Sequence, residues 1–420
     1  MGQQLGIVDY LFLYCMVSIW VMLFVNIVLT IGGYIYYLKT LKMNLDEPLN
    51  AYPFVSILIP AHNEEKVIGQ TVSALIALDY PRDKYEIIVI NDNSSDQTGE
   101  ILANIQRRVP DFNLNIITTD TVTGGKGKSN ALNIGFQKSK GELIAVYDAD
   151  NTPERNALKY LVHALRRDDS LGAVIGKFRT RNRNKNMLTR FINIETLGFQ
   201  WMVQAGRWQL FNLCTIPGTN FIVRKSIIEE MGGWDTKAIA EDTEISFRLY
   251  RLGYKIKYIP MSVTWEQEPE TIPVWMRQRS RWVKGNVYVL VKNFKLLFSG
   301  ESKYIRFDLL YFSSIYFLFL SSAIISDLIF LLGVCDIIQF KVAGNTALLW
   351  LMAYLIFILE IAIALSMEKG ESNPKNIALI ALMYFTYCQL WLIVAIRGVW
   401  LYVKDSFLGL EAKWYKTERF

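Results

Sequence analysis

A long uncharged segment near the N-terminus constrains the fold of this 420-residue chain more than any other feature. No charged residue occurs between Asp9 and Lys39, and this stretch exceeds the roughly 20 residues that cross a bilayer as a helix. A signal peptide has a shorter apolar core, a basic start and a small-residue cleavage site. Here Lys39 and Lys42 follow the apolar run instead. We predict an uncleaved membrane helix with its cytoplasmic flank over residues 1–45, with the N-terminus outside.

Three further apolar segments lie near the C-terminus, within residues 301–405, and we predict that each is a transmembrane segment. They cover about residues 309–335, 347–367 and 377–403. The first contains Asp327 and the second contains Glu360. Ionisable side chains inside spans face protein or water. These two carboxyl groups therefore either line a polar path or form hydrogen bonds between helices.

The basic tail, residues 406–420, creates a conflict over topology. Four crossings from an outside N-terminus leave the C-terminus outside. Basic residues favour the cytoplasm, and they gather here at Lys404, Lys413, Lys416 and Arg419. One apolar run that is re-entrant or interfacial would remove the conflict. In either case the pattern predicts a multi-pass protein of the cell (plasma) membrane with its central domain in the cytoplasm.

The composition limits the partners. Hydrophobic residues make up 52% and charged residues 20%, which excludes a disordered chain and argues against a wholly soluble one. The net charge of +6 suits an anionic membrane surface or substrate, but it is far from the charge of a nucleic-acid-binding protein. The four cysteines have no metal-pair spacing, and the two histidines exclude a histidine-rich metal site.

The middle of the chain, residues 50–270, has the pattern of one α/β domain. Helical stretches alternate with short apolar runs that are typical of strands. These runs are Phe54–Pro60, Glu86–Asn91, Asn113–Thr118 and Glu142–Tyr147. The alternation predicts a doubly wound, mostly parallel sheet with both faces covered, flanked by transmembrane helices. Ligands of such sheets bind beyond the carboxyl ends of the strands, so the residues there are the first candidates for chemistry.

Acidic residues follow three of these strands. Asn63 and Glu64 come after the first, Asp92 after the second, and the pair Asp148 and Asp150 after the fourth. A carboxylate at such a position can accept hydrogen bonds from ribose hydroxyls or a base edge. Two carboxylates in Asp-x-Asp can hold a hard divalent cation while phosphate oxygens complete its coordination. A solvated turn has the same spacing, so the pattern alone leaves both interpretations open.

A glycine-rich stretch, Gly124–Ser129, ends like a phosphate-binding P-loop. The first glycine of that motif is missing, because Val122 stands in its place, so an ATPase is not expected. The remaining glycines still suit a backbone that approaches a phosphate, and Lys126 or Lys128 can supply positive charge. A nucleotide phosphate remains the predicted ligand.

Two later segments carry further candidate residues. Asp242 follows Glu241 at the start of a helical pattern, where it either caps the helix or acts as a catalytic base. Residues 271–300 mix Trp, Val and Leu with Lys and Arg, and this predicts an amphipathic helix at the membrane surface.

One face of this amphipathic helix has a distinctive composition. Gln278, Arg281 and Trp282 are spaced to share that face, whereas Arg279 is expected to point elsewhere. Arg binds diphosphate oxygens with its planar fork, and Trp stacks on a sugar ring. A basic surface helix without a site fits the charges as well, but it does not require this Gln, Arg and Trp face.

The order of these motifs resembles one enzyme family. The matching segments are Phe54–Glu64, Asn91–Asp96, Asp148–Asp150, Glu241–Asp242 and Gln278–Trp282. Together they are similar to the membrane-embedded, processive glycosyltransferases of family 2, which include the synthases of cellulose, hyaluronan, chitin oligosaccharides and poly-N-acetylglucosamine. The single leading span and the stretch Trp265–Thr271 look closest to the poly-β-1,6-N-acetylglucosamine and chitin-oligosaccharide branch.

The resemblance implies a GT-A-like nucleotide-diphospho-sugar transferase fold and a role for each matched residue. Asn63, Glu64 and Asp92 would hold uridine. Asp148 and Asp150 would hold Mg²⁺ or Mn²⁺ on the diphosphate, with Lys128 nearby, and Asp242 would be the general base. The acceptor end and the diphosphate would be bound by Gln278, Arg281 and Trp282. Two departures leave the sugar open: Ala240 stands where Thr is common, and Lys284-Gly285 stands where the poly-N-acetylglucosamine branch usually has Gln-Gly.

The implied function is an inverting β-glycosyltransferase that polymerises a hexose or N-acetylhexosamine from a UDP-sugar. The expected donor is UDP-N-acetylglucosamine, the sugar nucleotide used by the branch that the sequence resembles most. The acceptor is the growing polysaccharide, which would leave through the lipid bilayer. A small membrane accessory subunit is a further possible partner. The first alternative is a non-processive membrane glycosyltransferase that acts on a lipid-linked acceptor. The second is a transporter or receptor with a cytoplasmic nucleotide-binding domain, which would not explain Asp242.

Overall fold

The central sheet has eight strands, and the order of the strands determines which loops lie side by side at its edge. The structure, a computed structural model, describes residues 5–49, 51–299, 303–338, 342 and 346–409. The strands are β1 (Val55–Ala61), β2 (Tyr85–Asp92), β3 (Leu114–Thr119), β4 (Leu143–Val146), β5 (Thr152–Pro153), β6 (Leu171–Thr180), β7 (Phe221–Arg224) and β8 (Lys255–Glu266). Their order in the sheet is β3-β2-β1-β4-β7-β6-β8-β5.

Parallel pairing dominates the half of the sheet that carries the acidic strand ends. Strands β3, β2, β1 and β4 are parallel, β7 is antiparallel to both β4 and β6, and β8 is parallel to β6. All eight positions of β2 are buried, as expected for a strand covered on both faces. The predicted α/β fold with a mostly parallel sheet is confirmed.

Two hydrophobic clusters cover the two faces of the sheet. Alternate side chains of β2 show the division, because Ile88 and Ile90 enter one cluster while Ile87 and Val89 enter the other. The helices that cover the first face are α4 (Lys128–Lys138), α6 (Met187–Gly198), α8 (Lys225–Glu230), α9 (Glu241–Arg251) and α10 (Ile272–Asn293). The second face is covered by α2 (Ile68–Ile76), α3 (Thr98–Arg108) and α5 (Ala157–Arg166). Short η1 (Arg82–Lys84) precedes β2.

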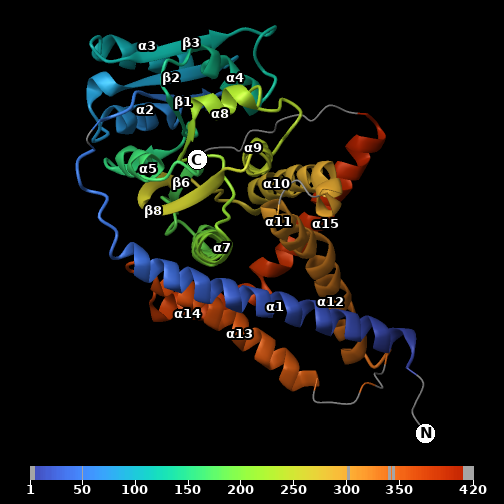
Figure 1. Ribbon diagram of the computed structural model, residues 1–420. Coiled ribbons are helices and arrows are strands. Elements are labelled where there is room, and N and C mark those ends of the chain that lie inside the picture. Colours follow the sequence, from blue (N-terminus) through green and yellow to red (C-terminus); the bar gives the residue numbers. More distant parts are fainter. Residues whose placement is uncertain (1–4, 50, 300–302, 339–341, 343–345, 410–420) are drawn as a thin grey trace.

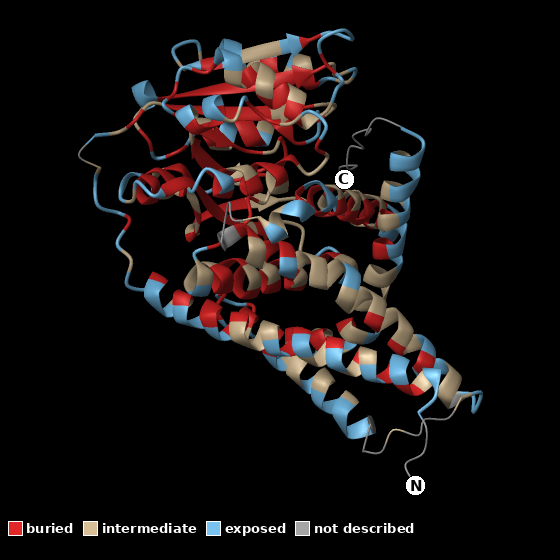
Figure 2. Ribbon diagram, turned by 45° about the vertical axis from the view of Figure 1, so that its right-hand side comes forward, coloured by how far each residue is buried: buried red, intermediate tan, exposed pale blue. Residues whose placement is uncertain are grey.

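In the part of the chain that the structure describes, three helices are long and apolar enough to cross a membrane. They are α1 (Ile7–Thr40), the segment Ile305–Gly333 and the segment Ala347–Ser366. The second segment comprises α11 (Lys303–Ser313), η4 (Ser314–Phe319) and α12 (Leu320–Val334), and the third lies in α13 (Thr346–Ser366). These helices extend away from the central sheet on one side (Figure 1), and exposed residues occur along most of their length, whereas the strands are buried (Figure 2).

The last apolar run is interrupted. It forms α14 (Pro374–Phe385) and α15 (Tyr387–Phe407), which are bent by 43° at Thr386. By length and composition this pair is either a broken span or a re-entrant loop. Most of the basic tail, including Lys413, Lys416 and Arg419, lies outside the described residues.

Two helical elements lie between the sheet and the membrane helices. The predicted amphipathic helix corresponds to α10 and the following η3 (Phe294–Phe298). The other is the continuous helix formed by α6, η2 (Phe199–Ala205) and α7 (Gly206–Phe211), which the sequence pattern did not separate from the central domain. It crosses α1 at close range, since a Cβ atom on Gly33 would lie 2.0 Å from the Trp201 carbonyl oxygen.

Buried ion pairs tie the membrane helices to the sheet. The loop between α13 and α14 carries Glu368 and Glu371, both of which are buried. Glu368 pairs with Lys177 and Arg179 of β6, and Glu371 accepts from Arg179 at 3.1 Å. Removing one partner of such a network leaves an uncompensated buried charge, so this loop is fixed against the domain that contains the sheet.

Candidate active site

Lys128 lies at the centre of the candidate active site. It is the first residue of α4, and the glycine-rich stretch leads into it. Its Nζ atom is 2.6 Å from Asp148 Oδ1 and 3.1 Å from Glu241 Oε1, and it donates a hydrogen bond to the Gly218 carbonyl at 2.9 Å. Burial lowers the pKa of Lys128, but the two carboxylates outweigh this effect and hold the pKa above its ordinary value.

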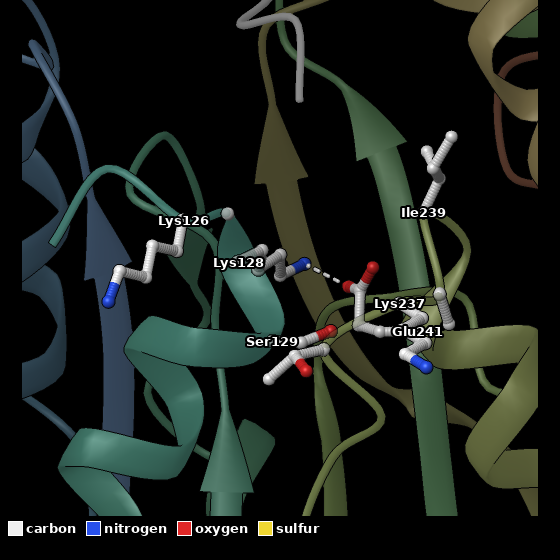
Figure 3. A pocket seen from close by; sticks show the side chains of 9 residues that line it. Lys126, Lys128, Ser129, Lys237, Ile239 and Glu241 are labelled. Carbon is white, nitrogen blue, oxygen red and sulfur yellow. Dashed lines mark ion pairs between the residues drawn. The ribbon is translucent and has the colours of Figure 1, made fainter. Parts of the chain in front are cut away.

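The pair Lys128 and Glu241 borders a hollow beside the site. Figure 3 shows both side chains directed toward each other from α4 and α9. Ser129 lies below them, and Lys237 lies on the same side of the hollow as Glu241, across from Lys128. Sequence reasoning gave Glu241 no role of its own. The structure shows that it is one of the two carboxylates that form an ion pair with Lys128.

Asp242 is half-buried at the start of α9. The N-cap of α9 is Ala240, so Asp242 lies inside the first turn and does not occupy the cap. Its Oδ1 atom accepts a hydrogen bond from the Thr243 amide at 2.7 Å. Burial and the neighbouring Glu241 carboxylate raise the pKa of Asp242 to about 7, although Lys128 opposes the shift. A carboxyl group with this pKa can accept a proton near neutral pH.

The loop between α7 and β7 connects these groups, and sequence reasoning missed it. The Asp148 amide donates to Thr219 Oγ1 at 3.0 Å, next to the Gly218 carbonyl that binds Lys128. Gly218 has a φ of 86°, and a Cβ atom there would lie 2.9 Å from Asp242 Oδ2. The position therefore requires glycine both for its backbone and for space. The Pro-Gly pair at positions 217 and 218 was the available signal.

Asp148 and Asp150 follow β4, as predicted. The Asp148 side chain is 33% exposed, whereas Asp150 is buried. No group of three or more His, Cys, Asp or Glu side chains suited to a metal occurs among the described residues. Two carboxylates at a strand end do fit a cation whose remaining ligands are phosphate oxygens and water, which is the usual arrangement for Mg²⁺.

Asp92 supports the glycine-rich loop. Its Oδ1 atom accepts hydrogen bonds from the Gly125 amide and from Thr119 Oγ1, each at 2.9 Å. A Cβ atom on Gly124 would lie 2.4 Å from the same oxygen, so only glycine fits there. Asp92 thus fixes the loop from which Lys128 extends, and its contact with uridine stays a prediction.

Asn63 and Glu64 join the loop after β1 to the loop after β2. Asn63 Oδ1 accepts from the Ser95 amide at 2.7 Å, and the Glu64 amide donates to Thr98 Oγ1 at 2.8 Å. Asn63 has a φ of 54°, a left-handed conformation that Asn tolerates better than most residues. These contacts hold the two strand ends together, and the uridine-binding role of both residues remains untested.

The three predicted residues of α10 differ in exposure. Gln278 is buried, Arg281 is half-buried, and the Trp282 side chain is 38% exposed. The expectation that Arg279 points away from this face is wrong. Arg279 Nη1 donates to Gln278 Oε1 at 2.7 Å, and its guanidinium carbon lies 3.9 Å from the centre of the Trp282 ring. Residues three apart are neighbours on a helix, which explains the contact between Arg279 and Trp282.

A close helix contact places α10 beside Asp242. A Cβ atom on Gly285 would lie 2.8 Å from the Cβ atom of Ala240, which immediately precedes Glu241. One residue further along α10, Asn286 Oδ1 accepts from Thr243 Oγ1 at 3.1 Å. One departure from the family pattern, Ala240, therefore contacts Gly285, the residue that follows the second departure, Lys284.

Comparison with known proteins identifies the family. Residues 53–285 match the family described as "Glycosyltransferase like family 2". The chain is 49% identical over 413 residues to the "Probable glycosyltransferase YdaM" of Bacillus subtilis (strain 168), covering 98% of both chains. It is 32% identical over 276 residues to the "Poly-beta-1,6-N-acetyl-D-glucosamine synthase" of Staphylococcus aureus (strain COL), covering 64% of this chain and 65% of that enzyme.

A solved structure shows the same fold. It is the mannosyltransferase PcManGT from Pyrobaculum calidifontis in complex with GDP-Man and Mn²⁺, with a TM-score of 0.60 and 21% identity over 91% of this chain and 99% of that chain. The fold is thus GT-A-like. The chain belongs to glycosyltransferase family 2, so it is a glycosyltransferase rather than a transporter or receptor.

Proposed function

We propose that this protein is an inverting β-glycosyltransferase that polymerises a hexose or N-acetylhexosamine from a UDP-sugar. The observation that supports it best is the position of Asp242, a half-buried carboxyl group with a pKa of about 7 beside Lys128, Glu241 and Asp148. The similarity to a poly-β-1,6-N-acetyl-D-glucosamine synthase favours UDP-N-acetylglucosamine as the donor and a related polysaccharide as the product.

In this mechanism Asp242 removes the proton from the acceptor hydroxyl. The hydroxyl oxygen then attacks the anomeric carbon from the face opposite UDP, the bond to the diphosphate breaks, and the configuration inverts from α to β. A base whose pKa is near the working pH combines a large ionised fraction with useful proton affinity. Gly218 leaves room beside the Asp242 carboxylate.

The donor diphosphate would lie between the end of β4 and Lys128. Asp148 and Asp150 would hold Mg²⁺ or Mn²⁺, which neutralises charge on the leaving diphosphate when bound. Lys128 now forms an ion pair with Asp148, and a cation at that carboxylate would free the ammonium group to bind phosphate oxygens. Asn63, Glu64 and Asp92 would bind the uridine from the neighbouring strand ends.

The cation requirement gives a direct prediction. Activity should disappear in excess EDTA and return with Mn²⁺ or Mg²⁺, because the two carboxylates alone do not neutralise a leaving diphosphate. Asp150→Ala should weaken binding of UDP measured together with Mn²⁺, while binding of UDP without metal should change little. Full activity in EDTA would remove the cation from the mechanism.

The acceptor end of the polymer would stack on Trp282. This ring is partly exposed on α10, and α10 contacts the start of α9 through Gly285 and Ala240. Gln278 and Arg281 on the same helix would bind the diphosphate from the opposite side. A growing chain at this position lies between the catalytic domain and the membrane helices.

We further propose that the protein crosses the membrane three times and that its catalytic domain is cytoplasmic. The helix α14 has 12 residues, about 18 Å, which is shorter than the roughly 30 Å apolar core. Its first turn contacts the catalytic side, because Arg190 of α6 donates to Asn376 at 2.9 Å. The far end of α15 returns to that side, where Asp405 pairs with Lys284 of α10. With three crossings, Lys404 would lie in the cytoplasm, as its positive charge favours.

Thiol labelling in intact cells tests this topology. Cys335, exposed in the connection after α12, should react with a membrane-impermeant reagent from outside. In a Ser406→Cys variant, the new thiol at the end of α15 should react only after the cells are permeabilised. Labelling of position 406 in intact cells would show that α14 and α15 complete a fourth crossing.

Product analysis tests the function. Purified protein in lipid is incubated with labelled UDP-sugars, and the products are separated by size. A ladder from UDP-N-acetylglucosamine is the expected result. Addition of a single sugar to a lipid-linked acceptor would instead support the alternative, a non-processive membrane glycosyltransferase.

A further inference from the structure

A cavity lies where the chain leaves the membrane helix α1 and enters the catalytic domain. Its volume is about 430 Å³, and its walls come from the segment after α1, the end of α5 and strand β8. In Figure 1 the blue connection that follows α1 passes beside α5 on its way to β1. Three lining residues are basic, Lys42, Arg167 and Lys257, and one is acidic, Asp168. We call this the basic cavity.

Lys257 is the most buried of the three basic side chains that line the basic cavity and forms no ion pair there. It is half-buried on β8, and among the residues that the structure describes no carboxylate lies within 4 Å of its Nζ atom. The ammonium group is 5.7 Å from the centre of the Trp208 ring. Burial lowers the pKa of Lys257 below its ordinary value. The Asp168 carboxylate opposes this shift without forming an ion pair with Lys257, and the charge of Arg167 adds to the lowering. A partly desolvated ammonium without a contact ion pair is unfavourable unless an anion binds beside it.

The other charged groups of the basic cavity do not neutralise its excess of positive charge. Lys42 is exposed and has no ion pair in the described part of the chain. Arg167 pairs with Glu47 at 2.8 Å, but both side chains are more than half exposed, so water or another anion can replace this contact. Asp168 is bound within its own turn, where the Ser170 hydroxyl donates to it at 2.6 Å, and its one negative charge is shared between Lys255 and Lys257.

The basic cavity is at the edge of the lipid-facing surface. Leu38, in the last turn of α1, and Leu41, which directly follows the helix, are 44% and 65% exposed, and Lys42 comes next. On the neighbouring helix α7, Leu210 is exposed two residues after Trp208. Exposed leucines next to a tryptophan and lysines are typical of a membrane interface, where basic side chains reach anionic headgroups.

We propose that the basic cavity binds a phosphate anion carried by the headgroup of an acidic phospholipid or by a soluble phosphate ester. Lys257 and Arg167 bind the phosphate oxygens, Lys42 adds charge at the rim, and the apolar side chains of Met43 and Ile259 contact the attached carbon chain. The site is separate from the sugar-transfer residues and does not depend on the donor or the product.

Native mass spectrometry of the full-length protein in detergent tests the lipid source. Phosphatidylglycerol and phosphatidylcholine of equal chain length are added in turn. Wild type should retain phosphatidylglycerol about tenfold better, because a charge-assisted hydrogen bond is worth roughly 1.4 kcal/mol or more. Lys257→Gln should lose this preference, whereas Lys257→Arg should keep it. Lys138→Gln, which removes an exposed cation at the end of α4, is the matched control.

A second arm distinguishes the soluble source. Binding of glycerol 3-phosphate to wild type and to Lys257→Gln is measured by calorimetry in a zwitterionic detergent. Binding that requires Lys257 would support a phosphate site filled from solution, even without lipid preference. The proposal is overturned if neither ligand depends on Lys257, or if wild type retains both lipids equally and does not bind glycerol 3-phosphate.

Discussion

Asp242 combines two properties that a general base needs. Its carboxylate is half-buried, and burial together with the charge of Glu241 raises its pKa to about 7. Lys128 limits the shift, because its ammonium group favours the ionised carboxylate. Chemistry at Asp242 therefore depends on the balance between two neighbouring charges of opposite sign.

The raised pKa predicts a pH dependence. A base must be ionised to act, so kcat/KM for transfer should rise as pH increases from about 6 to 8 and level off above the pKa of Asp242. Lys128→Gln removes the opposing positive charge and should move the acid limb to higher pH. An acid limb that stays below pH 5 in both proteins would show that Asp242 is not the group that titrates.

The raised pKa also affects stability. The folded pKa of Asp242 is above the unfolded value near 3.8, so its protonated form favours folding. This contribution is complete below about pH 4 and is lost as pH rises through about 7. Asp242→Asn cannot ionise and should melt at the same temperature as wild type, or higher, at pH 8. A clear loss of thermal stability in this variant would contradict the assignment.

Arg279 contacts two side chains of α10 that we propose bind the acceptor and the diphosphate. It donates to Gln278, contacts the Trp282 ring, and lies 3.4 Å from Glu195 and 3.8 Å from Glu268. Arg279→Lys keeps the positive charge beside both carboxylates but removes the planar fork. We expect elongation to slow by about tenfold, the equivalent of one lost hydrogen bond of roughly 1.4 kcal/mol, with little change in UDP affinity or melting temperature.

The control for Arg279 is the same exchange at Arg277, which is half-buried on the same helix. Arg277→Lys should leave elongation near the wild-type rate. Full elongation by Arg279→Lys would contradict the positioning role, and a large loss of thermal stability would indicate a purely structural one.

At the scale of elements, the contact between α9 and α10 sets the distance from Asp242, the proposed base, to α10, which we propose binds the acceptor. Gly285→Ala would place a methyl group 2.8 Å from Ala240 Cβ and 3.0 Å from its backbone nitrogen. The start of α9 would have to move, and small displacements at a reacting centre are costly. We expect transfer to fall by about tenfold to a hundredfold, while UDP binding changes little.

A compensating change makes this prediction specific. Ala240→Gly removes the opposing Cβ atom, so the double variant Ala240→Gly with Gly285→Ala should recover part of the lost activity. Additive losses in the double variant would show that the two positions are not coupled.

At the scale of the whole molecule, local patterns predicted the fold and part of the site. Short apolar runs between helical stretches predicted four of the strands, and the carboxyl ends of parallel strands predicted the positions of Asp92, Asp148 and their neighbours. Long uncharged runs gave the membrane helices. These signals are local, so they can be read without knowing which segments meet.

Contacts between distant segments could not be predicted in this way. The ion pair between Lys128 and Glu241 joins α4 to α9, and the role of Gly218 depends on both. The break at Thr386 has no charged residue or proline beside it in the sequence. It becomes understandable only in the fold, where Tyr387 binds Glu195 and accepts a hydrogen bond from Trp275 at 2.9 Å.

The central claim is that Asp242 performs the proton transfer in polymer synthesis and is not needed to hold the donor. The most direct test measures labelled polymer formed from UDP-N-acetylglucosamine, together with UDP affinity in the presence of Mn²⁺, for wild type and Asp242→Asn. We predict that wild type forms a ladder and that the variant loses on the order of 10²–10⁴ in rate with nearly unchanged UDP affinity. Polymer formation at the wild-type rate by the variant, or a loss of UDP affinity as large as the loss of rate, would contradict this mechanism.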